Sequence, residues 1–288
     1  MIITKLKGGL GNQLFQYAFG SVLSKLNNTE LKLDIEGYNV PQRKETRRVY
    51  SLSNFNIKAE IASHYEIKRF KYPFGIISKI WRLFKAKVLR VHCVGYNPKA
   101  LAWRGNLYID GFWQSEKYFV SFERDIRSEL TLKSPMSAFA NTFKDSILNE
   151  KNSISIHIRR GDLILNMYSD PHAGICTPEY YSKAFDYIKS QIKTDGRVFF
   201  FSDDIEWVKD NIKTSFPASY VSCPEITDYE ELVLMSLCKH NIIANSSFSW
   251  WGAWLNENKK KIIIAPSRWV TKGEDDYVDI TPPSWIRI

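Results

Sequence analysis

A short segment of this chain, SISIHIRRGD (residues 153–162), combines an imidazole with two adjacent guanidinium groups. Its isoleucines alternate with polar residues, which is the periodicity of a β-strand with one apolar face. His157 and Arg159 would then point to the same side of the strand, with Arg160 just beyond its end. Open α/β sheets bind ligands at this carboxyl edge, and guanidinium groups form bidentate hydrogen bonds to anionic oxygens. The segment therefore predicts a phosphate or diphosphate site. The alternative, a surface strand end with solvated charges, leaves the imidazole and the apolar alternation unexplained.

A serine-rich cluster, NSSFS (residues 245–249), leads directly into a tryptophan-rich helical pattern. Asn245, Ser246 and Ser247 would place an amide, hydroxyls and free backbone N–H groups at a helix start, which suits a phosphate. The alternative is plain capping of the helix. Phe248 would either stack on a nucleobase or fill the core.

Two acids, Asp203 and Asp204, follow a hydrophobic strand pattern at residues 197–201. Paired carboxylates at such a place could hold Mg²⁺ against a diphosphate. Alternatively, one of them could accept hydrogen bonds from the N1 and N2 donors of guanine. We favour base recognition and no metal, because the arginines already offer positive charge to a diphosphate. Asp204 could also simply cap the next helix.

Near the N-terminus, a glycine loop at residues 8–11 separates a strand pattern from a helical pattern, and a second strand ends at Asp34. This resembles a dinucleotide-binding fingerprint, but Leu14 stands where the third glycine belongs, which disfavours a nicotinamide or flavin site. Asn12 and Gln13 place two amides where the helix begins, able to donate to and accept from a polar sugar. Further along, Trp113 and Gln114 alternate aromatic and polar groups as sugar-binding walls do.

The elements that must position these residues alternate between strand and helix along the chain, which predicts doubly wound, mainly parallel sheets. Strands are expected at 1–7, 30–34, 106–112, 153–159, 197–201, 220–222, 241–244 and 261–265. Helices are expected at 14–26, 136–148, 177–192, 228–238 and 250–255. If the sheets are parallel, the clusters that begin at His157, Ser202 and Asn245 share one edge.

The net charge of +9 is concentrated in one segment. Residues 67–109 contain ten lysines and arginines and no acid, so they carry the whole positive excess. Within them, residues 76–90 read as a basic amphipathic helix, which would either lie on an anionic membrane surface or pack on the domain core. The four cysteines show no CxxC spacing, and no secretion signal or bilayer-spanning run is evident. We therefore expect a cytoplasmic protein, which would be peripheral on the inner face of the membrane if the basic helix lies on that surface.

With these residues in view, the chain resembles the bacterial α-1,2-fucosyltransferases of glycosyltransferase family 11. Family members commonly have a tyrosine after the HxRRGD motif, where this chain has Leu163. The matching motifs run in the family's order from near the N-terminus to near the C-terminus: GGLGNQLFQYA (8–18), HIRRGD (157–162), FSDD (201–204) and NSSFSWWGA (245–253).

The resemblance implies two Rossmann-like domains facing a cleft (GT-B type), at 1–134 for the acceptor and 135–288 for GDP-fucose, with no metal or cofactor. It also implies inverting transfer of L-fucose from GDP-β-L-fucose to the 2-hydroxyl of a terminal β-galactoside in a surface glycan. If the basic segment 67–109 holds the enzyme at the inner face of a membrane, the acceptor would be lipid-linked. We expect Arg159 and His157 to act on the diphosphate, Asp162 to be the candidate base and Asn12 to orient the sugars. Donor contacts are expected from Arg160, Asp203, Asp204, Asn245, Ser246, Ser247 and Phe248, and acceptor contacts from Gln13, Trp113 and Gln114.

Two other functions remain open at this point. One is a glycosyltransferase that uses a different nucleotide sugar. The other is a protein that binds membrane surfaces or polyanions through residues 67–109, which would show salt-dependent binding and no sugar transfer. Nucleic acid is not an expected partner.

Overall fold

The computed structural model describes residues 1–288 except 41–47, 72–86, 91–94, 162–169, 193–194 and 273–276. The chain forms two compact units. Unit 1 comprises Met1–Lys133 and Asp275–Ile280, and unit 2 comprises Ser134–Glu274 and Thr281–Ile288. The return of a C-terminal segment to unit 1 has no signal in the sequence. It is held there through Asp279, whose carboxylate accepts hydrogen bonds from Lys117 Nζ and from the backbone N–H of Tyr96.

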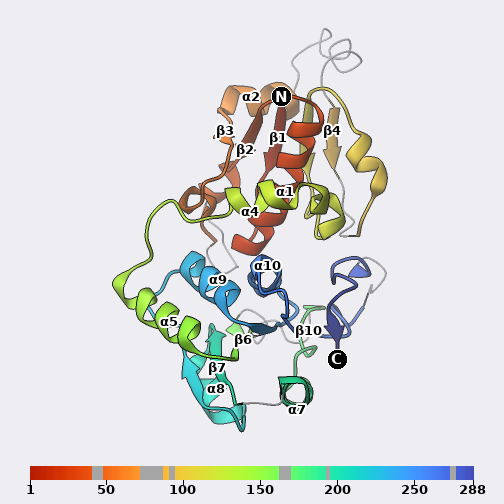
Figure 1. Ribbon diagram of the computed structural model, residues 1–288. Coiled ribbons are helices and arrows are strands. Elements are labelled where there is room, and N and C mark those ends of the chain that lie inside the picture. The colour runs from red at the N-terminus through yellow and green to blue at the C-terminus, as the bar shows by residue number, and fades with distance from the viewer. Residues whose placement is uncertain (41–47, 72–86, 91–94, 162–169, 193–194, 273–276) are drawn as a thin grey trace. The chain divides into compact units, whose positions relative to one another are not determined.

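Unit 1 is built on a five-stranded parallel sheet with the order β3-β2-β1-β5-β4 (Figure 1). The strands are β1 (Ile2–Lys5), β2 (Leu31–Asp34), β3 (Glu60–Ile61), β4 (Lys87–Arg90) and β5 (Leu107–Asp110). The helices are α1 (Leu10–Leu26), α2 (His64–Lys71) and α4 (Glu123–Glu129). Helix α1 approaches the sheet so closely that a Cβ at Gly20 would overlap Thr4 Oγ1. Ile3 and Tyr108 instead pack against Ile67 and Phe70 of α2.

Unit 2 is built on a six-stranded sheet with the order β11-β10-β9-β6-β7-β8, and its pairings are parallel. The strands are β6 (Ser153–Ile158), β7 (Arg197–Ser202), β8 (Ala218–Tyr220), β9 (His240–Ile242), β10 (Ile263–Ala265) and β11 (Ile286–Arg287). The helices are α5 (Ala138–Asn149), α7 (Pro178–Ile192), α8 (Ile205–Asn211), α9 (Asp228–Leu237) and α10 (Ser247–Leu255). β6 is buried along its whole length, and β7 is buried except at its first residue, because helices cover the sheet.

The predicted fold class, α/β with mainly parallel sheets in two Rossmann-like units, is confirmed. The helix predicted over residues 76–90 is wrong at its C-terminal end. Lys87–Arg90 form β4, and all four residues pair in parallel register with β5. Lys87–Arg90 form a strand despite their helical periodicity, because their backbone pairs with that of β5. The rest of that predicted helix, residues 76–86, lies outside the described residues.

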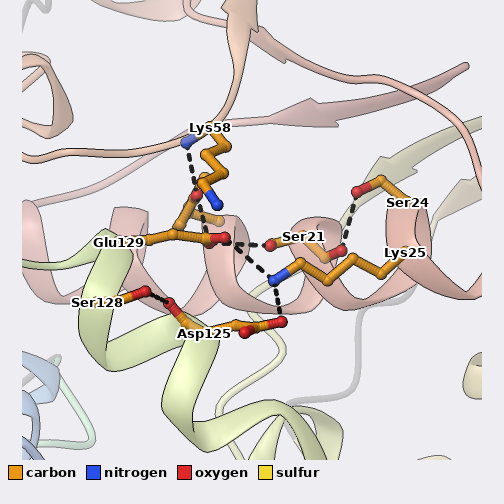
Figure 2. A network of polar contacts seen from close by, with 8 residues as sticks. Ser21, Ser24, Lys25, Lys58, Asp125, Ser128 and Glu129 are labelled. Carbon is orange, nitrogen blue, oxygen red and sulfur yellow. Dashed lines mark hydrogen bonds and ion pairs between the residues drawn. The ribbon is translucent and has the colours of Figure 1, made fainter.

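A buried carboxylate ties α4 to α1 in unit 1 (Figure 2). Glu129 is 1% exposed, and its Oε2 accepts hydrogen bonds from Tyr17 Oη at 2.7 Å and Ser21 Oγ at 3.1 Å. Its Oε1 accepts from Lys25 Nζ at 3.0 Å, and Lys25 also pairs with the exposed Asp125. Burial and the Glu129 charge raise the pKa of Tyr17, so the phenol stays protonated and donates. This network holds α4 in place.

Replacing Glu129 by glutamine is expected to destabilise unit 1 by about 1.5–3 kcal/mol, because buried donors lose a charged acceptor. The measurement is the midpoint of urea unfolding followed by circular dichroism. Asp125→Asn is the matched control, since it removes the exposed partner of the same Lys25 and should change the midpoint little. Equal effects of the two substitutions would contradict a special role for Glu129.

Candidate active site

Three polar clusters of unit 2 lie at the carboxyl edge of its sheet. The register pairs Ile158 at the end of β6 with Ser202 at the end of β7, and Ile156 with Ile242 at the end of β9. The segments that follow these strands therefore leave the sheet at the same edge. They contain the HIRRG turn, the SDD segment and the NSSF segment that begins α10.

The two acids after β7 shape the turn that carries the arginines. Asp203 accepts backbone N–H groups from Arg160 and from Gly161, both at 2.9 Å. Asp204 caps α8 by accepting from Trp207 N, and its other oxygen accepts from Arg160 Nε at 3.2 Å. The Arg160 guanidinium also lies 3.5 Å from the centre of the Trp207 ring. These contacts assign Asp203, Asp204 and Arg160 to holding the turn, which weakens the expectation that either acid reads a base.

His157 is a neutral imidazole with an unsatisfied buried nitrogen. It is 8% exposed, and burial together with the neighbouring Arg159 lowers its pKa to about 3. Within the described part of the chain its Nδ1 has no hydrogen-bond partner. Its ring lies edge-on to Phe248 with the centroids 5.5 Å apart, and its backbone carbonyl accepts from Tyr181 Oη. Such an orphaned polar atom calls for an explanation, and a bound ligand atom supplies one.

Asn245 is buried and joins loops rather than presenting its amide outward. Its Nδ2 donates to the backbone carbonyls of His172 at 2.8 Å and Trp269 at 3.0 Å. Ser246 caps α10 by accepting from Phe248 N at 3.3 Å. Ser247 begins α10, and both Ser247 and Phe248 are only partly buried. The N-terminus of this nine-residue helix thus lies close to the imidazole of His157 through Phe248. Its backbone N–H groups and dipole favour an anion.

A carboxyl group that sequence reasoning missed, Glu231 on α9, belongs to the same edge. Burial raises its pKa to about 7, with Asp228 and Asp203 acting in the same sense and a hydrogen bond with Ser222 opposing them. Ser222 in turn accepts from Ser202 N at the end of β7, at 2.9 Å. The neighbouring Glu230 caps α9, where its carboxylate accepts hydrogen bonds from the backbone N–H and the hydroxyl of Thr227. In the sequence, the only sign of Glu231 as a site residue is an acid directly after the capping Glu230. Acids are common in the first turn of a helix, so that position did not single it out.

In unit 1 the structure separates the expected acceptor residues into two kinds. Asn12 Oδ1 accepts from Gln114 Nε2 at 2.7 Å, so these two side chains form a pair beside the glycine loop. Gln13 is fully buried, and its amide bonds Val49 O, Gly8 O and Ser51 N. An amide with these partners holds loops together, so the expected acceptor role of Gln13 is revised.

Trp113 also departs from expectation. It is 1% exposed, and its ring stacks on Phe19 with centroids 4.3 Å apart. Trp103 and Tyr118 meet it edge-on. The indole therefore fills the core of unit 1 and has no open face on which a sugar could stack. The alternation of aromatic and polar residues reflected core packing at this position.

The remaining expectations concern the candidate base, the basic segment, a metal site and a membrane-spanning helix. Asp162, the candidate base, lies outside the described residues, as does most of the basic stretch between residues 72 and 94. Among the residues that are described, no group of three or more histidine, cysteine or acidic side chains could hold a metal ion. No helix in that part of the chain is long and apolar enough to cross a bilayer.

The comparison with known families decides the class of this protein. The family model described as glycosyl transferase family 11 matches residues 1–288. The chain belongs to glycosyltransferase family 11. The resemblance expected from the motifs is thus confirmed at the level of the family, and the protein is a fucosyltransferase-like glycosyltransferase.

Relatives within the family differ in the sugar that their names carry. An α-1,2-colitosyltransferase of Escherichia coli is 36% identical over 295 residues, covering 100% of this chain and 99% of the relative. The O-antigen biosynthesis glycosyltransferase WbnK of Escherichia coli is 31% identical over 302 residues, with 98% and 99% covered. Human galactoside α-(1,2)-fucosyltransferase 1 is 25% identical over 158 residues, which are 52% of this chain and 43% of the human protein.

Solved structures support the family's fold. The α-1,6-fucosyltransferase NodZ, soaked with GDP-fucose, superposes with a TM-score of 0.52 at 15% identity, covering 88% of this chain and 91% of NodZ. A mutant of Arabidopsis thaliana FUT1 in complex with GDP gives a TM-score of 0.51 at 11% identity, covering 98% of this chain and 74% of FUT1. At such identities the likeness shows the fold alone.

Proposed function

We propose that this protein transfers L-fucose from GDP-β-L-fucose, with inversion, to the 2-hydroxyl of a terminal β-galactoside. The observation that carries the proposal is the carboxyl edge of the unit 2 sheet. There His157 lies near the end of β6, and its buried Nδ1 has no hydrogen-bond partner among the described residues. Arg159 follows β6 directly, and α10 begins after β9, the neighbouring strand. A cation and a helix N-terminus suit a diphosphate, and a buried neutral imidazole suits a polar atom of the same ligand.

The division of labour at this edge follows from the charges. Arg159 bears the positive charge that stabilises the diphosphate as GDP departs. His157 stays neutral near pH 7, because burial and Arg159 lower its pKa to about 3, so it contributes a hydrogen bond and no charge. The N–H groups at the start of α10 add oriented dipoles. This replaces the expectation that His157 and Arg159 share the electrostatic work.

We assign guanine recognition to Glu231 in place of Asp203 and Asp204. Guanine presents donors at N1 and N2, which a single carboxylate accepts with its two oxygens. Asp203 already binds two backbone N–H groups, and Asp204 binds a helix cap and Arg160. The charge of Asp203 reaches Glu231, and burial raises the pKa of Glu231, so its ionised carboxylate gains from meeting new donors.

A second donor, GDP-colitose, is favoured by one specific observation. The relative named as an α-1,2-colitosyltransferase is 36% identical over the whole of this chain. Colitose differs from fucose in lacking the 3-hydroxyl. A site that hydrogen-bonds this hydroxyl would reject colitose strongly, whereas an apolar contact there would accept both sugars.

The deciding experiment measures kcat/KM with GDP-fucose and with GDP-colitose on a panel of β-galactosides, followed by linkage analysis of the product. An α-1,2-fucoside formed at least tenfold more efficiently than the colitoside is the expected result. A preference for GDP-colitose would move the protein to the second donor. Failure with both, together with tighter binding of UDP or ADP than of GDP, would overturn guanosine donors altogether. A parallel reaction with chelator tests the expected independence from metal.

The acceptor side rests on unit 1. We propose that the paired amides of Asn12 and Gln114 contact the acceptor sugar. A polysaccharide acceptor is supported by the relative named for O-antigen biosynthesis. A lipid-linked acceptor would bring the enzyme to the inner face of the membrane, and the basic segment 67–109 would serve this attachment through anionic headgroups.

A further inference from the structure

A histidine and an aspartate outside all the motifs discussed so far form a close pair in unit 2. His172 Nδ1 lies 2.8 Å from Asp170 Oδ1, and the same oxygen accepts the backbone N–H of His172 at 2.9 Å. A carboxylate can only accept, so Nδ1 carries the ring proton and Nε2 is the basic nitrogen. Each of the two side chains is 27% exposed, which leaves both within reach of a ligand.

Several hydrogen bonds to the backbone of residues 170–173 fix this pair near the carboxyl edge of the sheet. The carbonyl of His172 accepts from Nδ2 of Asn245, the residue just before the cap of α10. The carbonyl of Pro171, between the two residues of the pair, accepts from Thr271 N at 2.7 Å and Thr271 Oγ1 at 3.1 Å. Ala173 N donates back to Asp170 O. The side chains of the pair take no part in these bonds, so the bonds remain when His172 or Asp170 is substituted. Only the bond from His172 N to Asp170 Oδ1 depends on a side chain of the pair.

The charges around the pair connect it to the donor site. Burial acts to raise the pKa of Asp170, but hydrogen bonds from His172 and the positive charge of Arg159 outweigh it, so the pKa lies below its ordinary value. Asp170 is thus ionised near neutral pH, where it orients His172 and stabilises an imidazolium. Arg159 contributes to the same balance, so the pair lies in the electrostatic reach of the residue assigned to the diphosphate.

We propose that His172, oriented by Asp170, is the general base that deprotonates the acceptor hydroxyl. This inference rests on the proposed function. In the step, the acceptor O2–H bond breaks and its proton moves to His172 Nε2. O2 then forms the bond to the anomeric carbon while the bond from that carbon to the phosphate oxygen breaks, and GDP leaves with the electron pair. No further reactant is needed.

The test compares His172→Gln with His64→Gln. His64 is the matched control, because its Nδ1 also lies close to a carboxylate, Glu36 at 2.5 Å, but in unit 1 and on an exposed surface. We expect His172→Gln to lower kcat for transfer by about 10²–10³-fold, as loss of a general base does, with GDP affinity within about twofold of wild type. His64→Gln should leave both unchanged.

Three further readouts separate a base from a structural residue. Added imidazole should restore activity to His172→Ala, and Asp170→Asn should lower kcat without changing GDP affinity, because it presents the wrong tautomer. The pH dependence of kcat is measured at saturating donor, because Glu231, with a pKa of about 7, also titrates in this range and is assigned to donor binding. His157 stays neutral in the same range. We expect the pH dependence of kcat to change in His172→Gln and to stay as in wild type in His64→Gln.

The outcomes are distinct. A wild-type enzyme that transfers fucose, together with a His172→Gln variant that retains a third or more of kcat, would overturn the base and leave the proposed function intact. Parallel loss of GDP affinity in that variant would also overturn it, because the pair would then serve donor binding. A wild-type enzyme that transfers no sugar from a guanosine donor would remove the proposed function itself.

Discussion

Replacing Arg159 by alanine is expected to lower kcat by about 10²–10³-fold and to weaken GDP binding by about tenfold or more. The first figure is the usual loss when one donor to a developing anion is removed, and the second is that of a charge-assisted hydrogen bond. Arg159 follows β6 at the edge where α10 begins, and it is the arginine of the pair that we assign to the ligand. The measurements are steady-state kinetics with GDP-fucose and calorimetry with GDP.

The adjacent Arg160 offers a matched control of equal charge. Its guanidinium stacks on Trp207, and its Nε donates to Asp204, so it belongs to the framework of the turn. Arg160→Ala should therefore lower the unfolding midpoint of unit 2 and affect turnover less than Arg159→Ala does. Arg159→Lys, which keeps the charge but loses the bidentate fork, should fall between wild type and alanine. The reverse order, with Arg160 dominating turnover and GDP affinity, would show that the ligand arginine has been misassigned.

Substituting Glu231 by glutamine is expected to remove most of the discrimination between GDP and IDP. IDP lacks the N2 amino group, so wild type should bind it about tenfold or more weaker than GDP, the equivalent of one good hydrogen bond to a charged acceptor. The glutamine side chain has one acceptor oxygen and cannot bind both guanine donors. Competition binding with GDP, IDP and ADP gives the ratio directly. Asp203→Asn serves as the comparison, because its carboxylate holds backbone N–H groups and should affect stability more than base preference.

The same residue makes donor binding depend on pH. Glu231 must be ionised to accept from guanine, and burial raises its pKa to about 7. Its ionised fraction rises from about a tenth at pH 6 to about nine-tenths at pH 8, so GDP-fucose should bind up to about tenfold more tightly at the higher pH. His157 is neutral throughout this range and does not contribute. GDP-fucose is the correct probe, because GDP itself ends in a phosphate that titrates near the same pH. A flat profile in wild type, or an unchanged slope in Glu231→Gln, would contradict the assignment.

Local patterns in the sequence were sufficient for the frame of the site. The alternation of isoleucines in 153–159 placed β6, and the order of strands and helices required parallel pairing. Parallel pairing alone then brings the ends of β6, β7 and β9 to one edge, because every strand runs in the same direction. The family followed from four motifs in the same order, and the family model confirms it. These are properties of short segments, and neighbours in sequence largely determine them.

Which side chains face a ligand was decided only by the tertiary structure. Trp113 and Gln13 look like sugar contacts in the sequence, yet one fills a core and the other binds three backbone groups. In the sequence Asp203 is a candidate for binding a nucleobase, but both of its oxygens accept backbone N–H groups, from Arg160 and Gly161. Polar side chains find their partners across long sequence separations, so their availability depends on elements that only folding brings together.

Other residues of the proposed site carry no motif in the sequence and were found only in the structure. Glu231 lies among helix-capping acids, and Asp170 and His172 stand in a segment with no motif. Burial and the charges of Asp228 and Asp203 raise the pKa of Glu231. The loop that carries the histidine is fixed by Asn245 and Thr271, which lie far along the chain. Burial and neighbouring charge set the chemistry of a titratable group, and both are properties of the folded chain.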